Sequence, residues 1–114
     1  MLSPQNRLRR NAHFQYAYRK GRSSANQAMK LVYVRSGPPS GIRVGFSVSK
    51  KIGNAVVRNR TKRRMRAAMR ALLPQTERGY YLVFVAHPAA AQLTYWELER
   101  QMRALLSSVR LYHS

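Results

Sequence analysis

The first 76 residues of this 114-residue chain carry eighteen Lys and Arg side chains and not one Asp or Glu. The three acids of the sequence come later, as Glu77, Glu97 and Glu99. Salt bridges therefore cannot neutralise most of this charge, and apolar burial has to hold the fold against electrostatic repulsion. The chain is 45% hydrophobic, which suits one small core and argues against wholesale disorder. We expect a single domain over residues 1–114, with residues 1–10 as a flexible basic arm.

The formal net charge of +19 indicates a polyanionic partner. Arg outnumbers Lys, and a guanidinium both binds phosphate through two N–H groups and stacks on bases, which favours a nucleic acid over a membrane surface. No apolar run approaches the roughly 20 residues that span a bilayer. The N-terminus lacks the apolar core of a secretory signal, and the chain has no cysteine. These features predict a cytoplasmic protein.

Local patterns predict the element order helix, strand, strand, helix, strand, helix. The strands are expected at residues 30–35, 43–50 and 80–86, and the helices at 11–20, 54–73 and 94–109. The run YYLVFVA at 80–86 suits a strand covered on both faces, hence a central one. Thr94 and Glu97 have the spacing of a capping box, while residues 22–27 are predicted to form a loop. The predicted fold is a small two-layer α/β sandwich of the α+β type, with helices packed on a mixed sheet.

The strand RVGFSVSK at 43–50 alternates strictly between two kinds of side chain. Its core face is expected to carry Val44, Phe46 and Val48. Its other face would carry Gly45, Ser47 and Ser49. This second face is a flat, polar floor, which is either solvated or allows a flat ligand to approach the backbone.

The segment AVVRNRTKRRMRAAMR at 55–70 has the period of an amphipathic helix. At 100° per residue, one arc collects Val57, Thr61, Met65, Ala68, Met69 and Leu72. The opposite side carries Asn59, Arg60, Arg63, Arg66 and Arg70, with Lys62 and Arg64 at the borders. Charged helix faces normally mix acids with bases, whereas every charge pair here is repulsive. The pattern excludes a disordered tail and favours a surface that binds a polyanion over an idle solvated face.

The same segment also resembles a known family. KKIGNAVVRNRTKRRMR at 50–66 resembles the signature of the bacterial ribonuclease P protein component, and FQYAYRKG, RVGFSVSKKIGNAV and QLTYWELE resemble other parts of that family in the right order. The resemblance implies an endoribonuclease subunit that assists a catalytic RNA in removing the 5′ leader of precursor tRNA. It also implies that the RNA carries the active site with its magnesium ions. Finally, it implies a left-handed βαβ crossover, although right-handed crossovers are the general rule.

The resemblance further implies two groups of site residues. The catalytic RNA would contact Arg58, Asn59, Arg60, Lys62, Arg63, Arg66 and Arg70. The single-stranded leader would contact Phe14, Tyr18, Tyr33, Ser47, Ser49, Lys50 and Lys51. Aromatic side chains suit the second role because they stack on unpaired bases, each stack contributing roughly 1–3 kcal/mol. No catalytic residue, protein-bound metal, small-molecule substrate or membrane contact is expected.

Other functions fit the sequence less well. A two-metal nuclease needs clustered carboxylates, which three late Glu residues do not supply. A histidine acid–base pair among His13, His87 and His113 is a weak alternative. A generic RNA-binding structural protein of the ribosomal type shares the charge but does not predict an aromatic leader cleft. A basic module on anionic membranes or DNA is the third possibility.

Overall fold

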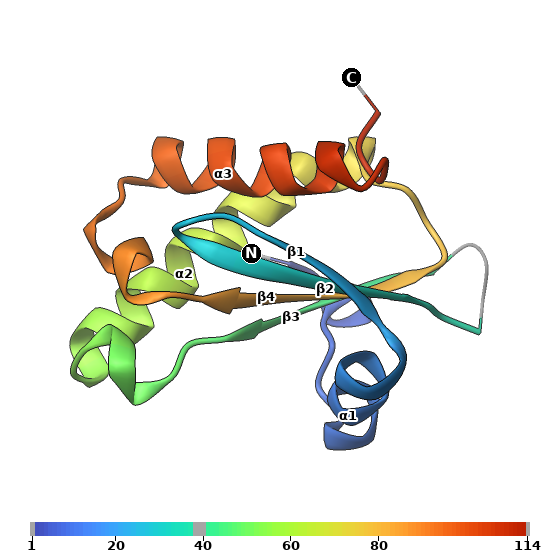
Figure 1. Cartoon of the computed structure of the whole chain (residues 1–114), viewed down its shortest axis with the longest axis horizontal. Helices are drawn as coiled ribbons and strands as arrows, with labels where there is room; N and C mark the ends of the chain where they lie inside the picture. The colour runs from blue at the N-terminus through green and yellow to red at the C-terminus, as the bar shows by residue number, and fades with distance from the viewer. Residues whose placement is uncertain (1, 38–40, 114) are drawn as a thin grey trace.

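The computed structural model describes residues 2–37 and 41–113, and within them it has three α-helices and one four-stranded sheet. The helices are α1 (Asn11–Lys20), α2 (Ala55–Leu72) and α3 (Tyr95–Ser108). The strands are β1 (Arg22–Ala25), β2 (Met29–Arg35), β3 (Ile42–Ser47) and β4 (Tyr80–Ala86). The chain order is α1–β1–β2–β3–α2–β4–α3 (Figure 1), which confirms the predicted α+β class and adds one strand. None of these helices has the length and apolar content to cross a membrane.

The sheet has the strand order β1-β2-β4-β3, with β4 in an inner position as its apolar run predicted. β2 is antiparallel to both of its neighbours, whereas β3 and β4 are parallel. A parallel pair needs a crossover connection, and α2 supplies it. The β3–α2–β4 unit is therefore the βαβ crossover for which the family resemblance implies a left-handed path.

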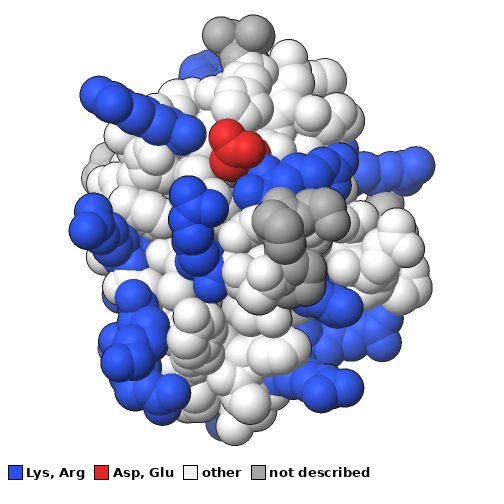
Figure 2. Space-filling model, turned by 90° about the vertical axis from the view of Figure 1, so that its right-hand side faces the viewer, with Lys and Arg blue, Asp and Glu red and all other residues white. Residues whose placement is uncertain are grey.

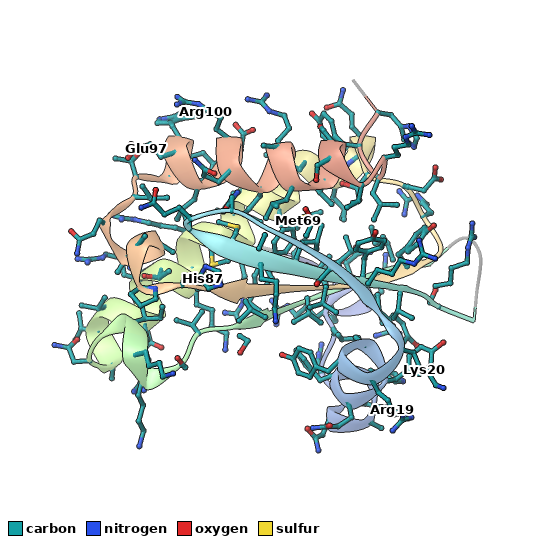
Figure 3. All side chains as sticks on the ribbon, viewed as in Figure 1. Arg19, Lys20, Met69, His87, Glu97 and Arg100 are labelled. Atoms are coloured by element: carbon teal, nitrogen blue, oxygen red, sulfur yellow. The ribbon has the colours of Figure 1, made fainter. Side chains whose placement is uncertain are left out.

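Helices cover the two faces of the sheet unequally (Figure 1). α2 and α3 lie over one face, where Phe84, Leu31 and Met69 belong to the main core. Met69 is labelled in Figure 3. α1 covers only one end of the other face, where Ala17 packs with Val83 in a smaller cluster. Because α1 is short, the remainder of that face has no α-helix over it within the described part of the chain.

Two local predictions were wrong. Residues 22–27 do not form a loop throughout, because β1 pairs with β2 from Arg22 opposite Tyr33 to Ala25 opposite Lys30. β1 is a polar edge strand, so it lacks the apolar alternation that would reveal it. The strand expected at 43–50 ends at Ser47, and Lys50–Ile52 form a short 3₁₀-helix instead.

The N-terminal segment was expected to be a flexible arm, but residues 2–10 pack against the sheet. Leu2 and Leu8 are 2% and 5% exposed. The Leu8 amide donates to the Val44 carbonyl at 3.0 Å, so the segment pairs with the outer edge of β3. Burial of these two leucines is the physical reason, since each stabilises the packed state by roughly 1.5–3 kcal/mol.

Candidate nucleic-acid interface

A tight turn connects β3 to the basic helix. The Ser49 hydroxyl accepts a hydrogen bond from the Lys51 amide at 3.4 Å, and Gly53 follows with φ of 150°, a conformation that side-chain-bearing residues rarely adopt. The Asn54 side chain then caps α2 by accepting from the Val57 amide at 3.0 Å. The turn therefore fixes where the first basic side chains of α2 project.

α2 has the amphipathic form that its sequence predicts. Its buried residues are Thr61, Met65, Ala68, Met69 and Leu72. Asn59, Arg63 and Arg70 are exposed on the opposite side. The remaining predicted RNA contacts are half-buried, at Arg58, Arg60, Lys62 and Arg66. The exposed and half-buried groups are thus distributed along α2, from its first turn to its last.

Two arginines of α2 differ from the others in their surroundings. The Arg64 guanidinium donates to the Leu93 carbonyl at 2.9 Å, so this side chain ties α2 to the segment before α3. The Nε of Arg60 is buried and has no hydrogen-bond partner among the described residues. Buried donors are normally paired, and a phosphate oxygen is one group that would satisfy this one.

Phe14 of α1 lies directly over Gly45 of β3. A Cβ atom added at Gly45 would come within 2.5 Å of the Phe14 Cζ atom, so only glycine leaves room for the ring. The Phe14 ring also stands 6.4 Å from the Tyr18 ring, centre to centre, and Tyr18 is 45% exposed. The two rings thus form an aromatic edge on α1, with Phe14 against the sheet and Tyr18 toward solvent.

A cavity of about 350 Å³ opens beside this aromatic edge, and we call it the Phe14 cavity. It is lined by Leu2, Arg7, Leu8, Arg9, Phe14, Val44, Gly45, Phe46, Lys62 and Arg66. α2 contributes Lys62 and Arg66, which were predicted to contact the catalytic RNA. The cavity therefore joins members of the two predicted groups, with an aromatic ring on one side and cations on the other.

Four other residues predicted to contact the leader lie at the end of β3 and in the turn that follows it. Ser47 lies two residues beyond Gly45, on the same side of the strand as the Phe14 ring. Ser49, Lys50 and Lys51 are exposed in the turn before α2. These side chains extend a polar and basic strip from the Phe14 cavity toward the start of the basic helix.

Tyr33 does not join Phe14 and Tyr18. It packs against the core cluster beneath α2 and α3, whereas Phe14 packs against the cluster on the α1 side of the sheet. Tyr33 lies two residues after Leu31 and therefore shares its face of β2. The sequence alone did not decide which face of β2 would meet α1, and the structure turns Tyr33 away from it.

Arg7 and Arg9 are cavity residues that sequence reasoning missed, because the N-terminal segment was treated as an arm. The buried Leu8 between them was the available signal, since an apolar residue amid charges marks a contact with the domain. The Arg7 Nε donates to the Leu2 carbonyl at 3.0 Å, so this side chain also has a structural role. Arg9 is exposed at the rim.

The acidic side chains lie apart from this interface. Glu99 pairs with Arg103 at 3.6 Å, and Glu77 contacts His113 at 3.1 Å. Glu97 lies at the start of α3, where the Thr94 amide donates to its carboxylate at 2.9 Å and lowers its pKa (Figure 3). Among the described residues that line the Phe14 cavity there is no carboxylate.

Comparisons with known proteins agree on one family. A family model described as Ribonuclease P matches residues 2–110. The ribonuclease P protein component of Symbiobacterium thermophilum is 40% identical over 105 residues, covering 92% of this chain and 91% of that protein. The corresponding protein of Thermobifida fusca is 42% identical over 116 residues, covering 96% and 79%. The solved ribonuclease P protein of Staphylococcus aureus is similar with a TM-score of 0.86, at 29% identity over 95% of this chain and 98% of that one.

Proposed function

The chain belongs to the bacterial ribonuclease P protein family, and we propose that its Phe14 cavity binds the 5′ leader of precursor tRNA while α2 binds the catalytic RNA. As the protein component of ribonuclease P, the chain is a subunit of a ribonucleoprotein endoribonuclease that takes part in tRNA 5′ maturation. This membership replaces the ribosomal-type alternative. It also implies the ribonuclease P RNA as a partner.

The observation that carries the leader proposal is the composition of the Phe14 cavity. An aromatic ring and the cations Lys62 and Arg66 line one concave space. Single-stranded nucleic acids are bound by this combination, because bases stack on rings while phosphates pair with cations. The glycine floor leaves room for the Phe14 ring, on which a base would stack. Ser47 and the lysines of the following turn would contact the next sugar and phosphate groups.

The exposed side of α2 supports the catalytic-RNA contact. Asn59, Arg63 and Arg70 point away from the sheet, and Arg58 and Arg60 lie in the first turns. Cations that neutralise phosphates release counterions from the RNA, which makes such binding strong at low salt and weaker as salt rises. Lys62 and Arg66 would lie where the two RNA partners meet, since they are on α2 and also line the cavity.

The proposal assigns magnesium to the RNA subunit and the substrate. Among residues 2–37 and 41–113, no three His, Asp or Glu side chains come together in a group that could hold an ion. The side chains of the chain would instead position the leader and screen the phosphate charge. As part of the same proposal, the chain acts as a single RNA-binding domain in the cytoplasm, where precursor tRNA is made.

Reconstitution with the cognate catalytic RNA tests this function. The holoenzyme should bind precursor tRNA more tightly than mature tRNA and should need less magnesium than the RNA alone. The protein alone should leave precursor tRNA uncut. Equal affinity of the holoenzyme for precursor and mature tRNA would remove the leader-binding role from the cavity while leaving the family membership intact.

A further inference from the structure

A second group of basic and aromatic side chains lies at the end of the sheet where β2 ends and β4 begins. It surrounds a cavity of about 340 Å³, which we call the Tyr80 cavity. The lining residues are Lys20, Arg22, Tyr33, Val34, Arg35 and Tyr80. None of them lines the Phe14 cavity, and Tyr33 and Tyr80 pack on the α3 side of the sheet. The two cavities are therefore separate surfaces.

Strand register builds the Tyr80 cavity. Arg35 and Tyr80 are partners across β2 and β4, and the Arg35 guanidinium carbon stands 5.2 Å from the centre of the Tyr80 ring. This distance is that of a cation–π contact, which presents a flat guanidinium and a flat ring together. Arg22 is the partner of Tyr33 across β1 and β2, so a second cation lies beside the second ring. Lys20, from the end of α1, completes the rim (Figure 3).

Within residues 2–37 and 41–113, the cations of this cavity have no carboxylate partner. Lys20, Arg22 and Arg35 are all exposed, and both ion pairs of the described residues involve other side chains. Figure 2 shows this end of the molecule, where Lys and Arg are widely spread and acidic atoms occupy little of the surface. Gathering three like charges costs stability, and internal pairing does not repay that cost. An anionic ligand would offset it.

We infer that the Tyr80 cavity binds an unpaired stretch of RNA, with a base stacked at Arg35 and Tyr80 and phosphates held by Lys20 and Arg22. Rings beside unpaired cations suit single-stranded RNA better than a duplex, whose bases are stacked on one another. The inference does not rest on the leader-binding proposal, because the two cavities share no residue. The nucleotides come either from the catalytic RNA or from precursor tRNA.

A double variant that removes two positive charges tests this site. Arg22→Gln with Arg35→Gln removes two cations and is compared with Arg100→Gln with Arg103→Gln, which removes two exposed arginines from α3. The first arm measures affinity for the catalytic RNA over a salt series. The second measures precursor and mature tRNA binding by the assembled holoenzyme. Relative to the control pair, we expect the affinity to fall about fivefold or more in one of the two arms. The slope of log affinity against log salt concentration should also decrease by about two phosphate contacts.

The two arms identify the source of the nucleotides. A loss in the first arm assigns the site to the catalytic RNA, and a loss confined to the second assigns it to precursor tRNA. If the double variant matches its control in both arms, the inference is wrong. Failure of the leader-binding proposal looks different, since it removes the preference for precursor tRNA from the unmodified protein.

A tethered probe gives an independent reading. The chain has no cysteine, so Lys20→Cys provides a single attachment point for an iron-EDTA cleavage reagent at the rim of the cavity. We expect cuts in a defined unpaired segment of one of the two RNAs within the holoenzyme. The same reagent on Arg103→Cys is the control. Absence of cuts above that control in both RNAs would overturn the inference even if the charge variants bind weakly.

Discussion

Replacing Gly45 by Ala should damage leader binding through the Phe14 ring. The new methyl carbon would lie 2.5 Å from the Phe14 Cζ atom and 2.7 Å from its Cε1 atom. β3 cannot easily yield, because it is paired with β4 on one side and bonded to the Leu8 amide on the other. The ring therefore has to move, and with it the surface on which a base would stack.

The size of the effect follows from these contacts. Carbon atoms pack best at about 3.5–4.0 Å, so the ring must retreat by about 1 Å or more. A base stack contributes about 1–3 kcal/mol, so its loss should weaken precursor binding by roughly 5- to 150-fold. Overpacking should cost about 1–3 kcal/mol of stability, partly offset by about 0.5–1 kcal/mol from replacing glycine within a strand. The melting temperature should fall by several degrees, roughly 4–8 °C for each kcal/mol lost.

The assay compares Kd values of the reconstituted holoenzyme for precursor and mature tRNA, well below the melting temperature of the variant. Gly37→Ala is the matched control, because a Cβ atom at Gly37 would meet none of the described residues within 4 Å. Gly45→Ala should weaken precursor binding and leave mature tRNA binding nearly unchanged. Gly37→Ala should change neither.

A double-mutant cycle with Phe14→Leu decides whether the ring carries the effect. In the Phe14→Leu background the clash is largely gone, so Gly45→Ala should add little to the loss of precursor affinity. If Gly45→Ala costs the same in both backgrounds, the ring is not the mediator. If precursor and mature tRNA affinities fall together, the substitution has damaged the fold or the catalytic-RNA contact, and the reasoning about the cavity fails.

Three further predictions follow from other parts of the interface and the fold. Arg60→Ala should weaken catalytic-RNA binding and reduce the log–log salt slope by about one phosphate contact; an unchanged slope would mean that Arg60 does not touch phosphate. Tyr18→Ala should lower holoenzyme affinity for precursor tRNA with little effect on mature tRNA, and a joint fall would indicate a structural role. The pKa of Glu97 is lowered in the folded protein, so its ionised carboxylate stabilises the fold at pH values above the ordinary pKa of 4.5. This stabilisation is lost as the pH falls through the lower pKa of the folded state. The difference in thermal stability between the wild type and Thr94→Ala should therefore narrow on acidification, as measured by thermal melts.

Local patterns predicted those elements whose side chains alternate strongly. The run at 80–86 is β4 with the same boundaries, and Asn54 caps the basic helix whose buried stripe follows the predicted arc. The capping box at Thr94 and Glu97 is also present. β1 was missed because Arg22–Ala25 is polar and exposed, and becomes a strand only by pairing with β2. Edge strands of this kind are decided by their neighbour rather than by their own pattern.

The candidate site also combines features that the sequence predicted with features that only the structure revealed. The absence of Asp and Glu before Glu77 and the basic side of α2 could be predicted from the sequence, because charge and helical period are local properties. The sequence could not show that Lys62 and Arg66 share a cavity with Phe14, since α1 and α2 are far apart along the chain. The same holds for Tyr33, whose partners depend on which face of the sheet each helix covers. The buried Leu2 and Leu8 likewise turned an expected arm into part of the cavity wall.

The sequence by itself therefore determined the kind of partner, the family and the elements with strong periodicity. Each of these depends on composition or on residues a few positions apart. The tertiary structure alone decided how the basic and aromatic side chains are grouped into the Phe14 and Tyr80 cavities. The physical reason is that a strand period assigns side chains to two faces without saying what covers either one, and that choice is made by long-range packing of helices on the sheet.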